Sequence, residues 1–116
     1  MTAKQVKQNE SGFILRVSAC FDMSSNTEIS LVIRKPDGSK LTKTRTGGEV
    51  TLGAVNVTDN DLGALLANQY VEYSVETGVL NLVGDYSVEL KYENSGSNEV
   101  LYGDTVTLEV VRNVDD

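Results

Sequence analysis

The sequence predicts an all-β fold, a sandwich of about seven to eight short antiparallel strands with one short helix near residues 58–67. Three observations predict it: apolar and polar residues alternate with period two, turn-forming Gly, Asn and Pro residues separate the alternating segments, and no long helical pattern occurs. The length of 116 residues and the hydrophobic content of 40% suit one domain spanning residues 1–116. We expect 1–9 to form an N-terminal arm and 113–116 a flexible tail.

The first predicted strands lead into a tight turn. In residues 13–19 apolar side chains fall on one side of the chain and polar ones on the other, and residues 27–35 alternate in the same way. The turn signal is Lys35-Pro-Asp-Gly-Ser39, because proline presets one φ angle and glycine accepts a positive one. A polar strand at 40–46 follows, so the sequence predicts a β-hairpin here.

Residues 58–67 are the segment in which a helix competes with a strand. Thr58 and Asp61 have the spacing of a capping box, and leucines at positions 62, 65 and 66 would share one helical face. Asn68 could close the helix in the left-handed conformation. The pattern therefore predicts a short helix.

The second half of the chain contains further amphipathic strands. Alternation extends over residues 71–76 and 86–93, and the chain finishes on strands at 100–102 and 106–110. Residues 94–98, Asn-Ser-Gly-Ser-Asn, have the composition of a hairpin loop. Regular spacing of such short strands is typical of a β-sandwich.

Gly84 and Tyr86 indicate how the sandwich turns one of its corners. In immunoglobulin-like sandwiches a tyrosine near the start of a strand returns its hydroxyl group to the backbone of the corner. A glycine just before it would let the chain turn sharply. Val88 stands where an antibody domain has cysteine, and the chain has no tryptophan. The sequence thus predicts an immunoglobulin-like sandwich without the central disulfide.

Three segments, residues 12–18, 28–38 and 82–90, resemble the immunoglobulin-like domains of tailed-bacteriophage virion proteins. The chain is similar to the N-terminal domain of phage baseplate upper proteins and to small accessory proteins of tail, neck or capsid. The resemblance implies a non-enzymatic structural protein, made in the host bacterial cytoplasm and built into the virion. It implies a tail, neck or baseplate adaptor that binds other virion proteins in symmetric multiple copies, with capsid decoration as the alternative.

The absence of histidine removes the commonest general base and the commonest metal ligand. We therefore expect no catalysis and no cofactor. Asp59-Asn60-Asp61 begins like a calcium loop, but Ala64 and Tyr70 stand where that loop needs Gly and Glu. Capping explains these carboxylates better, and a calcium site of another type stays open.

The single cysteine and the hydropathy pattern bear on the environment of the chain. Cys20 ends an apolar stretch, and we expect it to be a small buried hydrophobic residue. No stretch approaches the roughly 20 apolar residues that cross a bilayer, so we expect no membrane contact.

Charge is distributed unevenly along the chain. The net charge of −7 divides into 8 basic and 4 acidic residues before position 46, against 2 basic and 13 acidic residues after it. Half of the basic residues lie on the predicted hairpin: Arg34, Lys35, Lys40, Lys43 and Arg45. They could protect a solvated edge strand, or contact an acidic partner or the acidic half of another copy. Nucleic acid is not an expected partner, because the net charge has the wrong sign and no aromatic residues interleave with the basic ones.

A host-surface carbohydrate-binding or adhesion module is the alternative from another functional class. Such a module needs a cluster of exposed aromatic side chains. Of the five tyrosines, Tyr73, Tyr86 and Tyr92 are predicted to point inward, which leaves Tyr70 and Tyr102 as candidates.

Overall fold

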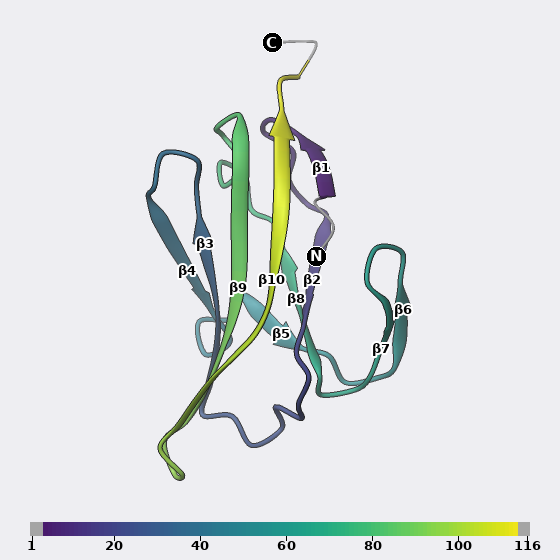
Figure 1. Cartoon of the computed structure of the whole chain (residues 1–116), viewed down its shortest axis with the longest axis vertical. Helices are drawn as coiled ribbons and strands as arrows, with labels where there is room; N and C mark the ends of the chain where they lie inside the picture. The colour runs from purple at the N-terminus through teal and green to yellow at the C-terminus, as the bar shows by residue number, and fades with distance from the viewer. Residues whose placement is uncertain (1–3, 114–116) are drawn as a thin grey trace.

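A computed structural model of the chain describes residues 4–113 and is all-β, as predicted (Figure 1). Ten strands are present within the described residues. They are β1 (Lys4–Lys7), β2 (Ile14–Ser18), β3 (Glu28–Arg34), β4 (Lys40–Thr44), β5 (Val50–Leu52), β6 (Val57–Asp59), β7 (Gly63–Leu65), β8 (Tyr70–Ser74), β9 (Gly84–Asn94) and β10 (Glu99–Val111). The count is higher than predicted because the chain forms short strands at its start and in the segment expected to be helical.

The strands form two facing sheets and a separate hairpin. The large sheet has the order β1-β10-β9-β3-β4, the small sheet has the order β2-β8-β5, and β6 pairs only with β7. One cluster of buried apolar side chains fills the space between the sheets, with Val17 and Val71 from the small sheet and Leu31 and Leu90 from the large one. The burial of these alternating residues holds the sandwich together.

The predicted hairpin is confirmed as β3–β4. Lys35 N–H donates to Ser39 O at 2.8 Å, Gly38 N–H donates to Lys35 O at 2.9 Å, and Gly38 has φ of 89°. The Asp37 carboxylate accepts from the Ser39 N–H at 3.0 Å and from its hydroxyl at 2.6 Å. These bonds lower the pKa of Asp37 and fix the turn.

The tyrosine corner is also confirmed. Tyr86 is fully buried, and its hydroxyl oxygen accepts a hydrogen bond from Leu82 N–H at 3.0 Å. Gly84 has φ of 133°, and a Cβ placed on it would lie 2.9 Å from the ring atoms of Pro36. The turn of β3–β4 therefore packs on this corner, and only glycine fits there.

The predicted helix at 58–67 is wrong, because the segment forms the β6–β7 hairpin instead. Asp59 acts as the cap: its carboxylate accepts from Asp61 N–H at 2.9 Å and from Leu62 N–H at 3.0 Å. Gly63 follows with φ of 81° and begins β7. Asn68 does adopt the predicted left-handed conformation, with φ of 65°, but in a turn before β8.

Two smaller expectations also differ from the structure. Residues 4–7 of the expected arm form β1, which pairs in parallel with β10 in an otherwise antiparallel large sheet. Cys20 is exposed: it lies in the loop after β2, between buried Ala19 and Phe21, which packs against the core. Of the expected tail at 113–116, only Asn113 belongs to the described residues, and 114–116 lie outside them.

The β9–β10 hairpin extends beyond the rest of the sandwich. Its two strands have 11 and 13 residues, whereas the other strands have 3 to 7. In Figure 1 the end of this hairpin projects at the lower left, below the body of the molecule. We call residues 91–102 the hairpin arm.

Candidate protein-binding surfaces

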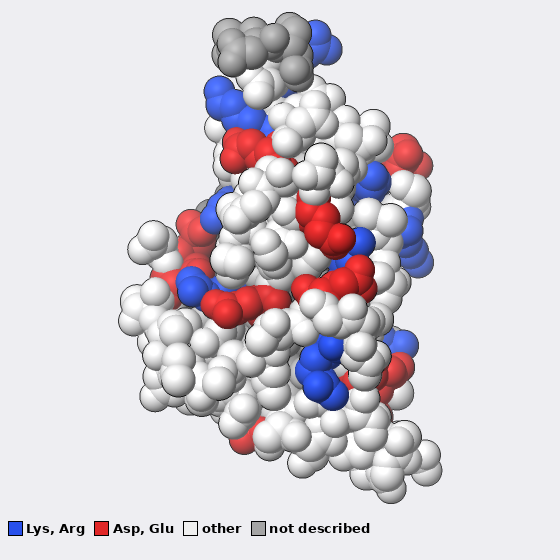
Figure 2. Space-filling view, turned by 180° about the vertical axis from the view of Figure 1, so that it is seen from behind, with Lys and Arg blue, Asp and Glu red and all other residues white. Residues whose placement is uncertain are grey.

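The structure divides the five predicted basic residues between two places. Arg34 and Lys40 face each other across the β3–β4 pair, and both are exposed. Lys35, in the same turn, donates from Nζ to Asn81 Oδ1 at 2.9 Å. We call these three residues the basic turn. Figure 2 shows basic groups along the right-hand edge of the upper half, the side on which β3–β4 lies.

Lys43 and Arg45 do not join the basic turn. Lys43 lies on the inner side of β4, opposite Leu31, and its side chain is only 15% exposed. Its Nζ forms ion pairs with Glu76 at 3.0 Å and Glu49 at 3.4 Å. Arg45 donates from Nε to Asn26 Oδ1 at 2.8 Å. These two cations therefore take part in holding the fold together.

Lys43 belongs to a small polar cluster beside the edge strand β4. The Tyr73 hydroxyl group donates to Glu76 Oε1 at 3.1 Å, beside the Lys43 ammonium group. Hydrogen bonds from Lys43 and Tyr73 lower the pKa of Glu76. Burial and the Glu76 carboxylate raise the pKa of Tyr73 to about 12. Each polar group here has a partner within the chain, which indicates a structural role.

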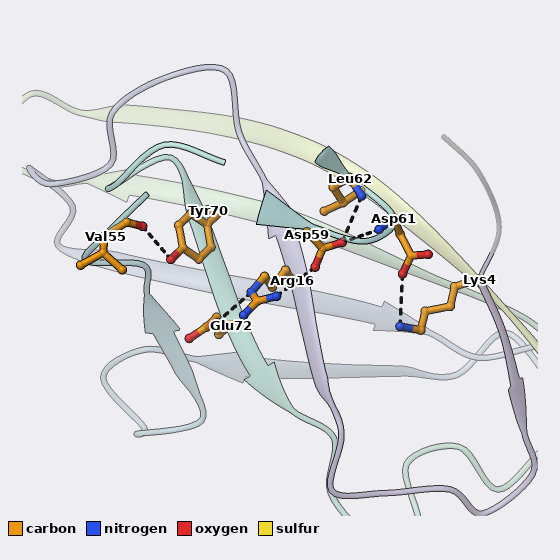
Figure 3. Close-up of polar contacts among 8 residues, drawn as sticks. All are labelled: Lys4, Arg16, Val55, Asp59, Asp61, Leu62, Tyr70 and Glu72. Carbon is orange, nitrogen blue, oxygen red and sulfur yellow. Dashed lines mark hydrogen bonds and ion pairs between the residues drawn. The ribbon is translucent and has the colours of Figure 1, made fainter. Parts of the chain in front are cut away.

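A second polar cluster fastens the β6–β7 hairpin to the small sheet (Figure 3). The Arg16 guanidinium group donates to Glu72 at 2.9 Å and to Asp59 at 3.1 Å. Burial pushes the pKa of Asp59 upward, but the N–H groups of Asp61 and Leu62 and the Arg16 guanidinium together lower it. Hydrogen bonds to Asp59 and Glu72 raise the pKa of Arg16. Lys4 reaches Asp61 at 3.3 Å, so β1 is tied to the same hairpin.

The Asp59-Asn60-Asp61 carboxylates are thus engaged with the chain itself. Within residues 4–113, no three His, Cys, Asp or Glu side chains gather closely enough to hold a metal ion. In the same range every buried side-chain nitrogen or oxygen has a hydrogen-bond partner.

No helix in the described part of the chain is long and apolar enough to span a membrane.

Tyr70 and Tyr102 differ sharply in exposure. Tyr73, Tyr86 and Tyr92 are buried as predicted, but so is Tyr70, which is 2% exposed. The Tyr70 ring lies on Gly53, and its hydroxyl group donates to Val55 O at 2.9 Å. Tyr102 is 58% exposed. The prediction for Tyr70 is wrong because the segment after β5 covers its side of the small sheet.

The hairpin arm presents an exposed apolar surface, of which the sequence predicted only Tyr102. Val100, Leu101 and Tyr102 are 52%, 38% and 58% exposed, although they are consecutive residues of one strand. On the face that Figure 2 shows, the end of the hairpin at the lower right is white, with no charged side chain in view. A signal existed in the sequence: these three apolar residues in a row break the alternation that a strand with one buried face requires.

Comparisons with known proteins give a fold but no family. No family model and no curated protein matches the chain. Among solved structures, the chain is similar to "The crystal structure of CopC from Methylosinus trichosporium OB3b" with a TM-score of 0.51. The identity is 11%, and the alignment covers 98% of this chain and 90% of that one. At this identity the likeness concerns the β-fold alone.

Proposed function

We propose that this protein is a non-enzymatic structural component of a bacteriophage virion, an adaptor of tail, neck or baseplate that binds other virion proteins. The resemblance in residues 12–18, 28–38 and 82–90 is the reason for placing it in a virion. The first of these segments contains β2, the second contains β3 and its turn, and the third contains the tyrosine corner.

The basic turn is the observation that supports a binding role. Arg34 and Lys40 have no ion pair within the described residues, so both positive charges remain directed to solvent. Asp37 is the acidic residue of the turn itself, which leaves the turn with an excess of positive charge. In a chain with a net charge of −7, this local excess favours an acidic partner surface.

The remaining clusters support an adaptor rather than an enzyme. The groups around Lys43 and Arg16 are paired within the fold, as the contacts above describe. A protein of this kind acts through shape and charge, and repeated copies on a symmetric particle make weak individual contacts durable.

The two alternatives are distinguished by their surfaces and by where the protein binds. Capsid decoration would use the same basic turn on a different part of the particle. A carbohydrate-binding module needs several exposed aromatic rings, and Tyr102 is the exposed tyrosine among the described residues. The structure therefore offers less support for carbohydrate binding than for protein contacts.

The test is co-sedimentation of the purified protein with isolated phage tails and, separately, with empty capsids. Tail binding supports the adaptor, and binding to capsids alone would replace it with the decoration protein. If neither particle binds, the proposed virion role is wrong.

A charge test then asks whether the basic turn makes the contact. We expect the double variant Arg34→Ser/Lys40→Ser to weaken tail binding about tenfold or more in low salt, and the loss to shrink as salt increases. The matched control, Lys7→Ser/Arg112→Ser, removes the same charge from two other exposed residues and should bind normally. Equal weakening by both variants would show that net charge, rather than the turn, drives binding.

A further inference from the structure

We propose that two copies of this chain associate edge to edge through residues 99–103 of β10, as an antiparallel strand pair around a two-fold axis at Leu101. The inference concerns the isolated protein and does not depend on the virion role. It follows from an open sheet edge, from the direction of its backbone groups and from the order of its side chains.

The lower half of β10 has no strand on its outer side. β9 pairs with β10 along one edge, from Glu99 to Val110. On the other edge β1 pairs only with Leu108–Val111. No other strand in the described part of the chain pairs with β10, so the edge at Glu99–Tyr102 is free. In Figure 1 this segment runs below β1 into the projecting hairpin.

The backbone groups of Val100 and Tyr102 point toward this free edge. Arg45 N–H donates to Ile29 O, so Ile29 directs its backbone groups toward β4, and its neighbours in β3 direct theirs toward β9. The backbone N–H and C=O groups of successive residues point to alternate sides of an antiparallel strand. The backbone groups of Glu93 and Lys91 in β9 therefore point toward β3, and those of their partners in β10 point away from β9. Those partners are Val100 and Tyr102. Each can exchange hydrogen bonds with an added strand.

The side chains select one self-pairing register. With Leu101 opposite Leu101 of the second copy, Val100 faces Tyr102, and Glu99 faces Gly103. Val100 and Tyr102 are then a hydrogen-bonded pair on each side of the axis, as their backbone directions require. All three apolar residues meet apolar residues, and no like charges oppose each other. An axis at Tyr102 would instead place Val100 opposite Asp104.

The other end of the large sheet shows what a protected edge looks like. β4 is also an edge strand, but it contains Lys40 and Lys43, and lysine on an edge discourages strand addition. The segment Val100–Gly103 has no charged residue. A second copy is therefore the occupant that the β10 edge fits, because its own sequence is complementary to itself.

A disulfide experiment tests the register. In a Cys20→Ser background, which removes the exposed native thiol, Leu101→Cys should form a covalent dimer under mild oxidation. Residues that face each other in a non-hydrogen-bonded pair have the Cα separation that a disulfide needs. The matched control, Val100→Cys, faces Tyr102 of the second copy and should cross-link at least about tenfold more slowly. Equal rates, or no cross-linking of either variant, would overturn the register.

Sedimentation equilibrium tests the association itself. The wild-type protein should form a concentration-dependent dimer. Leu101→Lys and Leu101→Glu should each raise the dissociation constant about tenfold or more, because like charges then meet at the axis. An equimolar mixture of the two should restore dimers. Leu66→Lys, at another exposed leucine, should behave as wild type.

Two results would overturn the proposal: a wild-type protein that stays monomeric at millimolar concentration, or dimers that Leu101→Lys leaves intact. Circular dichroism of each variant establishes that it is folded. No phage component is present in these measurements. A result that contradicts the dimer therefore does not contradict the proposed virion role.

Discussion

Tyr70 and Tyr86 are both buried, but their hydroxyl groups are held by different parts of the chain. The Tyr86 hydroxyl is hydrogen-bonded to Leu82, four residues earlier, so both partners lie in one short segment. Tyr70 is bonded to Val55 and covers Gly53, from a segment that precedes it by 15 residues or more. A local contact of the first kind can be predicted from sequence, whereas a contact of the second kind depends on how the sheets assemble.

The corner bond gives a prediction at the scale of one atom. Tyr86→Phe removes the hydroxyl oxygen that accepts from Leu82 N–H and leaves the ring in the core. We expect a loss of about 1–2 kcal/mol in the free energy of unfolding, the cost of an unpaired backbone donor. Urea unfolding measures it. Tyr102→Phe, at an exposed tyrosine, should change stability by less than about 0.5 kcal/mol. Equal stability of the Tyr86 variant and the wild type would show that water replaces this bond.

At the scale of elements, the sequence patterns correctly predict strands that bury one face. The prediction fails for a segment whose contacts lie far away in the sequence. The β3–β4 turn and the β9 strand follow from alternation and turn chemistry alone. The segment at 58–67 satisfies a helical pattern, yet it forms a hairpin in which Asp59 caps a β-turn and pairs with Arg16 of β2. Neither the Arg16 contact nor the coverage of Tyr70 is visible in a local window of residues.

The basic candidate residues also show that local pairing can be predicted from sequence, whereas contacts between the sheets cannot. The grouping of Arg34 and Lys40 could be predicted, because hairpin pairing places them opposite each other. The ion pair of Lys43 with Glu76 could not be predicted, because Glu76 reaches the edge of β4 only when the two sheets face each other.

The Arg16 contact predicts a local change rather than a global one. Arg16→Ala should release the β6–β7 hairpin, because it removes the ion pair that joins Asp59 to the small sheet. Hydrogen–deuterium exchange should become faster in residues 57–65, while the strands of the large sheet keep their protection. Lys40→Ala, which also removes one cation, should leave exchange in the hairpin unchanged. Unchanged exchange in Arg16→Ala would show that strand pairing alone holds the hairpin.

At the scale of the whole molecule, the charges explain how stability should depend on pH. The carboxylates of Asp22, Glu28, Asp37, Asp59 and Glu76 all have lowered pKa values, because hydrogen bonds and cations within the fold favour their charged forms. A lowered pKa in the folded state stabilises the protein above the ordinary carboxyl pKa, and this contribution disappears as the pH falls. Tyr73 and Lys43 have raised pKa values, so their contributions are present below pH 10 and disappear as the pH rises beyond it.

Between these limits stability should be constant, because the chain has no histidine to titrate. We expect the urea midpoint to stay level from about pH 5.5 to 8.5, to fall below about pH 4, and to fall again above about pH 10. Glu76→Gln should flatten part of the acid limb, since it removes a carboxylate whose pKa Lys43 lowers. Tyr73→Phe should flatten part of the alkaline limb, since the phenol with a pKa of about 12 is then absent. A shift of the midpoint between pH 6 and 7 would contradict this account and would point to a coupled carboxyl group that titrates near neutrality.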